Sequence, residues 1–410
     1  MTIAIRCGTL IDGHGGEPVR GALVVIEGET VVSVGDGDAP RDAEVIDAAG
    51  LTVMPGMIDC HVHLMNRPPK TMEERLSTPF SLAVAEALTN ARISLEHGFT
   101  TLRDAGGTPR GVRTAIEQGL FPGPRLRVAV TAISQTGGHG DSTMPNGSVL
   151  RVSNAEVPHN LIDGSDSARR ATREILRAGA DQIKIMTSGG VLSPSDEPGA
   201  TGMTPDEIAA VMYEAHAAHR TVMSHAQAKQ GILNAVLAGV ESIEHGIYLD
   251  DEVIDAMLER GTFLVPTLIA PVSVLKLAEE HPGSMPSWGV RKSKEVIGAH
   301  QASFRYAVER GVRVAMGTDT GVGVHGTNAG ELQLMVANGM TPMQAIVATT
   351  KTAAECACLG AVTGTIEAGK RADILAVSGD PLADISVLQH AGKLKLIMRD
   401  GKSFKDDVSG

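Results

Sequence analysis

Strand-like and helix-like segments alternate through most of this 410-residue chain. Amphipathic helical stretches, such as Pro205–His219 and Pro342–Leu359, lie between or after short apolar runs. The eight apolar runs are 57–63, 99–104, 125–132, 182–187, 221–225, 242–245, 262–266 and 312–317. Eight such β/α units predict an α/β protein built on a (β/α)8 TIM-like barrel. A doubly wound open sheet is the rival, but no Gly-x-Gly-x-x-Gly turn follows the early strands.

The residue pattern at both ends of the chain differs from the alternating pattern of the middle. Short β-branched runs separated by Gly, Asp and Glu turns fill residues 2–54, and residues 372–402 repeat this pattern. They predict a small antiparallel β-sandwich domain assembled from both termini. The expected organisation is residues 1–55 and 364–410 for the sandwich and residues 56–363 for the barrel.

Composition excludes several classes of protein. A formal charge of −12, with no long basic run, argues against a nucleic-acid partner. We find neither a secretory signal nor 18 uninterrupted apolar residues, which predicts a cytoplasmic protein that does not enter membranes. Four scattered cysteines are too few for a disulfide framework, so we interpret them as ordinary thiols.

Two histidines end the first barrel strand. Because side chains alternate along a strand, His61 and His63 point the same way, whereas Cys60 and Val62 point the other. Two imidazoles then converge on one spot, as metal sites require. A bare His-x-His also recurs by chance, so this pair alone leaves both interpretations open.

Four further strands carry other polar residues, within the strand for Lys184 and at the strand end for the rest, and all fall on the face where barrel chemistry occurs. They are Lys184, His225, His245 and Asp319. A lone buried histidine is usually a satisfied core residue, and a lysine within an apolar strand is costly without a partner. Their joint occurrence with His61 and His63 therefore indicates a metal site.

The motifs that carry these residues resemble those of the amidohydrolase superfamily over nearly the whole chain. They are Pro55-Gly-Met-Ile-Asp-Cys-His-Val-His63, Gln182-Ile-Lys-Ile-Met186, Ser224-His225, Ile243-Glu-His-Gly246, Gly317-Thr-Asp319 and the closing stretch 364–375. Within the superfamily, Ser134-Gln-Thr-Gly-Gly-His139 and Lys184-Ile-Met-Thr-Ser-Gly-Gly190 are similar to the imidazolonepropionase-related group, which includes prolidase-like and Xaa-Arg/Lys dipeptidases.

The resemblance implies two divalent metal ions, with zinc as the expected metal. His61, His63 and Asp319 would hold one ion, His225 and His245 the other, and Lys184, carboxylated by CO2, would bridge both. A Schiff-base role is the rival for Lys184. Manganese, cobalt and iron also accept such mixed ligands.

This metal centre leads to a hypothesis of function: a metal-bridging hydroxide attacks the amide carbonyl of a dipeptide or N-acyl amino acid, and Asp319 shuttles the proton to the amine. The alternatives are a cyclic-amide hydrolase like imidazolonepropionase and a non-catalytic scaffold. The expected partner is a small amide or dipeptide substrate, and the superfamily favours a homo-oligomer.

Substrate recognition is assigned to the long connections 133–165 and 268–300 and to residues near the strand ends. His139 could contact a carboxylate or carbonyl oxygen, or merely stabilise its loop. Gln227 stands where prolidase-like relatives often carry Tyr, which counts against proline dipeptides. His325 is a further substrate-binding candidate, with a structural duty as its rival. The other histidines, including His300, lie on predicted helices or peripheral loops and receive no chemical role.

Overall fold

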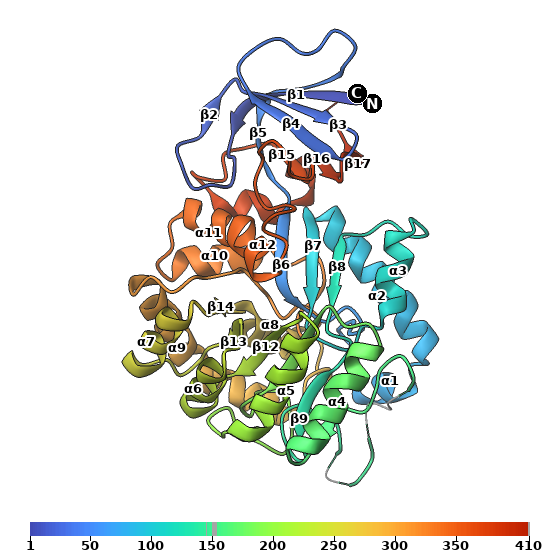
Figure 1. The fold of residues 1–410 in the computed structure, drawn as a ribbon, viewed down its shortest axis with the longest axis vertical. Coiled ribbons are helices and arrows are strands. Elements are labelled where there is room, and N and C mark those ends of the chain that lie inside the picture. Colours follow the sequence, from blue (N-terminus) through green and yellow to red (C-terminus); the bar gives the residue numbers. More distant parts are fainter. Residues whose placement is uncertain (145, 150–153, 409–410) are drawn as a thin grey trace.

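A computed structural model of the chain describes residues 1–144, 146–149 and 154–408. Five residues of the predicted loop 133–165, namely 145 and 150–153, and the last two of the predicted C-terminal segment, 409–410, lie outside the described residues. Figure 1 shows a sheet-rich unit that holds both labelled termini at one end and a larger unit of strands and helices below it. Within the described ranges, no helix is both long and apolar enough to cross a membrane.

Strands from both ends of the chain form one eight-stranded sheet in the upper unit of Figure 1. They are β1 (Thr2–Leu10), β2 (Val19–Arg20), β3 (Leu23–Glu27), β4 (Thr30–Gly35), β5 (Glu44–Pro55), β15 (Ile374–Val377), β16 (Leu394–Arg399) and β17 (Lys402–Asp406). The terminal segments therefore pair as expected, through β5 and β15. The prediction of a purely antiparallel sheet is wrong, because β1 and β5 run parallel. A parallel pair forms because the long connection through β3 and β4 returns the chain in the same direction.

The remaining strands are parallel and form two sheets. The first contains β6 (Met57–Val62), β7 (Phe99–Asp104) and β8 (Arg125–Val128). The second contains β9 (Ala132–Gln135), β10 (Leu161–Ile162), β11 (Gln182–Met186), β12 (Thr221–Ala226), β13 (Ser242–His245) and β14 (Phe263–Val265). The predicted strand 125–132 is thus split between β8 and β9. Val130, at φ 65°, interrupts the extended backbone between them.

The predicted eighth strand, 312–317, forms isolated bridges rather than a regular strand. Leu264 pairs with Val314, and the amide of Cys60 donates to Met316 O at 2.9 Å, so this stretch lies between β14 and β6. At Gly317 the backbone packs so closely that a Cβ would come within 2.4 Å of Val265. This close approach and the positive φ of Asp319 (59°) end the extended conformation.

Helices flank the parallel strands in the lower unit of Figure 1. They are α1 (Met72–Ser77), α2 (Phe80–Glu96), α3 (Arg110–Glu117), α4 (Ser165–Arg177), α5 (Pro205–Ala217), α6 (Lys229–Ala238), α7 (Asp251–Arg260), α8 (Ile269–Glu280), α9 (Ser287–Glu309), α10 (Gly330–Ala337), α11 (Pro342–Thr349) and α12 (Lys351–Cys356), with short 3-10 turns η1 (Ile385–Gln389) and η2 (Ala391–Lys393) before β16. The predicted helix at 205 begins where expected, because Thr204 and Glu207 form a reciprocal cap around Pro205.

One predicted helix and one predicted loop differ from the structure for identifiable reasons. The predicted helix Pro342–Leu359 is two helices, α11 and α12, which meet at Thr350 (φ −124°, ψ −93°). The bend lets the Thr349 hydroxyl donate to Ile58 O on β6, at 3.0 Å. The predicted loop 268–300 is mostly helix α8 and the first half of α9. Pro271 did not break α8, because proline is tolerated within a helix's first turn.

One large apolar core lies between the parallel strands and the helices, and a second core lies against the terminal sheet. Cys60 and Val62 point into apolar clusters, as the strand alternation predicted. The packed core holds the strand ends rigidly, so the side chains that follow them have fixed positions.

Candidate metal centre and active site

The two histidines at the end of β6 are oriented by different partners. The Nδ1 of His61 donates to Glu244 Oε2 at 2.6 Å, and the Nδ1 of His63 donates to Gly106 O at 2.8 Å. Both rings therefore use Nδ1 for these partners and direct Nε2 elsewhere. These two nitrogens approach the same oxygen, Asp319 Oδ1, at 3.5 Å from His61 and 3.3 Å from His63. The ligand atoms of the three residues lie within 4.8 Å of one another, as metal ligands must.

The histidines that end β12 and β13 form a second pair beside the first. His225 directs Nε2 at Gly189 O, 3.0 Å away, and His245 directs Nδ1 at Thr267 Oγ1, 2.7 Å away. Their ring centroids are 4.6 Å apart, and those of His245 and His61 are 5.2 Å apart. The four predicted imidazoles thus form one continuous cluster.

Lys184 enters this cluster from the middle of β11. The side chain is only 1% exposed, and its ammonium has no hydrogen bond or ion pair within the part of the chain that the structure describes. Burial lowers the pKa of Lys184 to about 8, although Glu244 and Asp319 act in the opposite direction. A neutral amine is therefore accessible near physiological pH, as both the carbamate and the Schiff-base hypotheses require.

The donor set fits a divalent cation. A carbonyl oxygen can only accept, so Gly106 and Gly189 fix the proton of their histidines on the bonded nitrogen and leave a lone pair on the other. Burial also lowers the pKa of His61, His225 and His245 well below the usual value, which keeps these rings neutral. Neutral imidazoles and one carboxylate are the ligands that zinc and related ions prefer.

A cavity of about 770 Å³ opens over the cluster. All six predicted metal ligands line it, together with His139 and Gln227. The surrounding wall is mainly aliphatic, with Met65, Leu192, Val274 and Val322 among its members. Apolar walls around a few polar groups are typical of small-molecule sites.

His139 and Gln227 lie where they can reach a bound substrate. The ring of His139 stacks on that of His225, with centroids 4.1 Å apart, and its Nδ1 lies 2.8 Å from Ser193 Oγ. Burial lowers the pKa of His139 to about 4. Gln227 is 4% exposed, and its Oε1 has no hydrogen-bond partner among the described residues. Both residues remain candidates for substrate contact.

The structure does not bring His325 to the cavity wall. This residue is buried beside the metal cluster, and its Nε2 donates to Asn66 O at 3.0 Å. It ties its loop to the segment that follows His63, which favours the structural alternative.

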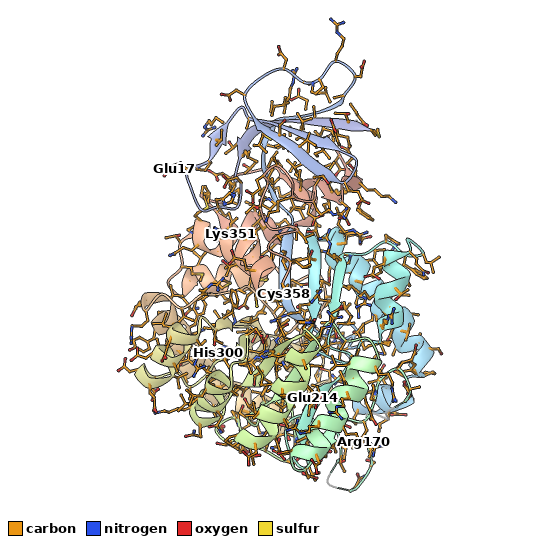
Figure 2. The ribbon with its side chains drawn as sticks, in the orientation of Figure 1. Glu17, Arg170, Glu214, His300, Lys351 and Cys358 are labelled. Carbon is orange, nitrogen blue, oxygen red and sulfur yellow. The ribbon has the colours of Figure 1, made fainter. Side chains whose placement is uncertain are left out.

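Sequence reasoning missed His300, which was placed among the peripheral histidines. His300 projects from α9, is 2% exposed and lines the cavity. Its Nε2 lies 3.1 Å from His245 O and 2.7 Å from Pro266 O. Figure 2 labels it over the strands of the lower unit, away from the outer rim. It was missed because α9 itself was predicted as loop.

Glu244 and Arg103 were also missed as partners of the cluster. Both are buried charged residues within apolar strands, on β13 and β7. A buried charge needs a partner, so their presence in predicted strands was a usable signal. The partner itself was not readable, because the two residues are 141 positions apart in the chain.

Parallel α/β architecture with a histidine, lysine and aspartate cluster near the strand ends is typical of one class of protein, the metal-dependent hydrolases. The sequence profile of the amidohydrolase family matches residues 52–404, and the chain belongs to this family. It is therefore an enzyme of the amide-hydrolysing class. The resemblance predicted from the motifs is confirmed.

The chain is also similar to individual known proteins. The chain is 34% identical to the ochratoxinase of Aspergillus niger, with 98% of this chain and 86% of that protein covered. A crystal structure of a prolidase complexed with N-methylphosphonate-L-proline is 35% identical, with a TM-score of 0.92 and coverage of 99% and 100%. A Xaa-Pro dipeptidase with methionine in its active site is 34% identical, with a TM-score of 0.90 and coverage of 99% and 100%.

Proposed function

We propose that this enzyme hydrolyses the amide bond of a dipeptide or an N-acyl amino acid. The observation that carries the proposal is the orientation of the four cluster imidazoles. Each has one ring nitrogen oriented by a protein group outside the proposed ligand set. The prolidase, dipeptidase and ochratoxinase named among the similar proteins support an amide substrate.

Two divalent ions, with zinc as the proposed metal, would occupy this cluster. His61, His63 and Asp319 would hold one ion, and His225 and His245 the other. Lys184, carboxylated by CO2, would bridge them. Support for the lysine's role comes from its burial and from an ammonium without a recorded partner among the described residues. When bound, the ions supply Lewis-acid polarisation of the scissile carbonyl and lower the pKa of a water molecule.

Asp319 is the proposed proton carrier. Burial disfavours its charged form, but His61 and His63 outweigh this effect and hold the pKa of Asp319 below its usual value. Its carboxylate is therefore ionised at neutral pH and can accept a proton from the attacking water. It would then pass this proton to the departing amine as the C–N bond breaks, so that one water and one amide give one acid and one amine.

Cationic side chains near the cavity wall favour substrates that carry a free carboxylate. Arg67, Lys70 and Arg75 all line the cavity. Lys70 pairs with Glu86 at 2.6 Å, whereas Arg67 and Arg75 have no carboxylate partner in the described ranges. An amino-acid carboxylate would complement these guanidinium groups. His139 and Gln227 are the proposed contacts nearer the scissile amide.

The architecture around this site is proposed to be a closed (β/α)8 barrel over residues 56–363, with a β-sandwich domain from residues 1–55 and 364–410. Backbone hydrogen bonds that connect β14 to 313–315 and residues 316–320 to the β6 segment support closure. The single terminal sheet with its own core supports the second domain. A homo-oligomer and a cytoplasmic location stay predictions from the sequence.

A substrate screen tests the proposal. The enzyme would be stripped with a chelator, reloaded with zinc and incubated with dipeptides and N-acyl amino acids that differ in their C-terminal residue, and free amino acid would be measured. We expect release from a subset of these substrates only after reloading. Cyclic amides form a separate arm. Hydrolysis of cyclic amides alone, or of nothing in either arm, would refute the proposed function.

A further inference from the structure

A buried carboxylate lies directly behind one of the proposed metal ligands. Glu244 precedes His245 on β13 and is 0% exposed. Its Oε2 accepts from His61 Nδ1 at 2.6 Å. Its Oε1 accepts from Ser242 Oγ at 2.5 Å and from Arg103 Nη2 at 3.0 Å. Both carboxylate oxygens are therefore engaged, and one of them orients a metal-facing ring.

Arg103 compensates the charge of this buried carboxylate through an ion pair. The guanidinium is 3% exposed and, besides Glu244, donates to Cys60 O at 2.7 Å and Ser242 Oγ at 3.1 Å. Its contacts connect β7 with the backbone of β6 and the side chains of β13. A buried ion pair contributes little net stability, but the loss of one partner leaves an uncompensated buried charge. The pair is therefore best judged by what it positions, and Glu244 lies behind His61.

The four imidazoles are not supported equally. Among the described residues outside the proposed ligand set, a carboxylate orients only His61, whereas the partners of His63 and His225 are neutral carbonyl oxygens and that of His245 is a hydroxyl. A carboxylate fixes the Nδ1 proton and makes the opposite nitrogen a stronger electron donor. His61 should consequently bind a cation more tightly than a ring that a neutral group orients.

We propose that Glu244, held and neutralised by Arg103, is a positioning residue that sets the metal affinity of the His61, His63 and Asp319 position, separately from the position of His225 and His245. The inference rests on the proposed two-metal centre. It concerns the residues of this chain behind that centre.

The change Glu244→Gln tests this role because glutamine cannot serve both neighbours. If its oxygen accepts from Arg103, its NH2 faces the Nδ1 proton of His61, and the ring must move its proton to Nε2 and lose the metal-facing lone pair. If the oxygen instead accepts from His61, the NH2 faces the guanidinium. The Nδ1 tautomer of His61 therefore becomes unfavourable or costly in either arrangement.

Thr267→Val is the matched control for the other position. Thr267 is 0% exposed and orients His245 through its hydroxyl, so valine removes that hydrogen bond at almost constant volume. Chelator competition with zinc should give two dissociation constants per chain for the wild type. Glu244→Gln should weaken zinc binding at one position about 10- to 100-fold and leave the second dissociation constant within about threefold of the wild-type value. Thr267→Val should weaken the other constant, and the double variant should weaken both.

Ser242→Ala keeps the carboxylate and removes one of its donors, so it should shift the same constant as Glu244→Gln by a smaller factor. It also serves if Glu244→Gln does not fold. A third variant, Arg103→Met with Glu244→Gln, removes both charges of the buried pair and so separates positioning of His61 from simple charge balance. The zinc affinity that Glu244→Gln weakens should stay weak in this variant, whereas its recovery would overturn the proposal.

Unchanged constants in Glu244→Gln, or an equal loss at both positions, would also overturn the inference. If the wild type shows a single zinc dissociation constant and Glu244→Gln weakens it, the two-metal centre is refuted and the role of Glu244 stands. A wild type that binds no metal would refute both.

Discussion

Lys184 should lose its proton at a much lower pH than a surface lysine. Burial lowers its pKa from 10.5 to about 8. At pH 7 such an amine is neutral in about one molecule in ten, whereas an ordinary lysine is neutral in about one in three thousand. CO2 reacts only with the neutral amine, so Lys184 should form a carbamate that no exposed lysine matches.

Carbon-13 NMR of the metal-free protein with ¹³C-bicarbonate measures this reaction. A carbamate signal should rise as the pH increases from 6 to 9, with half of the increase near pH 8, because the neutral form accumulates through that range. The change Lys184→Met should remove the Lys184 carbamate signal at nearly constant side-chain volume, and the difference between the two spectra excludes any carbamate on the α-amino group. Added zinc should increase the wild-type signal, because the ions favour the anionic carbamate.

Lys292 provides the matched control. It is also 1% exposed, but its ammonium donates to three backbone carbonyls, those of Gly190, Ser193 and Asp196. These three hydrogen bonds occupy the N–H donors of a buried ammonium, so Lys292→Met should leave the carbamate signal unchanged. A wild-type spectrum identical to that of Lys184→Met, or a difference signal that develops only above pH 10, would refute the reasoning.

Three further outcomes are expected. Asp319→Asn should lower kcat by about 10²- to 10⁴-fold and still retain metal, as measured by steady-state kinetics with metal analysis; full turnover would discard the proton-carrier role. Gly190→Ala should lower kcat/KM about 10- to 100-fold, because the new Cβ would lie 2.3 to 2.8 Å from atoms of the His139 ring. Gly199→Ala should leave kcat/KM unchanged, because the new Cβ would meet nothing within 4 Å. Equal losses of kcat/KM in both variants would exclude steric displacement of His139. Burial raises the pKa of Glu331 to about 8, so its stabilising contribution is fully present below pH 4.5 and is lost as the pH rises to about 8. Urea unfolding of the metal-free protein should therefore show Glu331→Gln gaining up to about 4 kcal/mol relative to wild type between pH 5 and 8, whereas parallel pH profiles would contradict the assignment.

The residues of the histidine, lysine and aspartate cluster were predictable as a group because their signals are local. Alternation along β6 places His61 and His63 on one side, and parallel strands present their carboxyl ends at one edge. The structure then brings Lys184, His225, His245 and Asp319 to the same cavity, although their roles as ligands stay proposals.

What the sequence did not reveal depends on contacts between distant segments. Glu244 and Arg103 can be recognised as buried charges, but only the folded strands show that they meet behind His61. His300 reaches the cavity because α9 packs over the strand ends, and its helix was hidden by the Pro and Gly residues before it. Local propensity did not predict the break at Thr350 either, where the bend accompanies a hydrogen bond from Thr349 to the distant strand β6.

The central claim is that six side chains from five segments of the proposed barrel hold two cations. Anomalous diffraction at the zinc edge, from crystals of the zinc-loaded protein, tests it most directly. We predict two peaks per chain, one touching His61, His63 and Asp319 and the other His225 and His245, with the side chain of Lys184 in contact with both. A single peak, or peaks away from Lys184, would contradict the account.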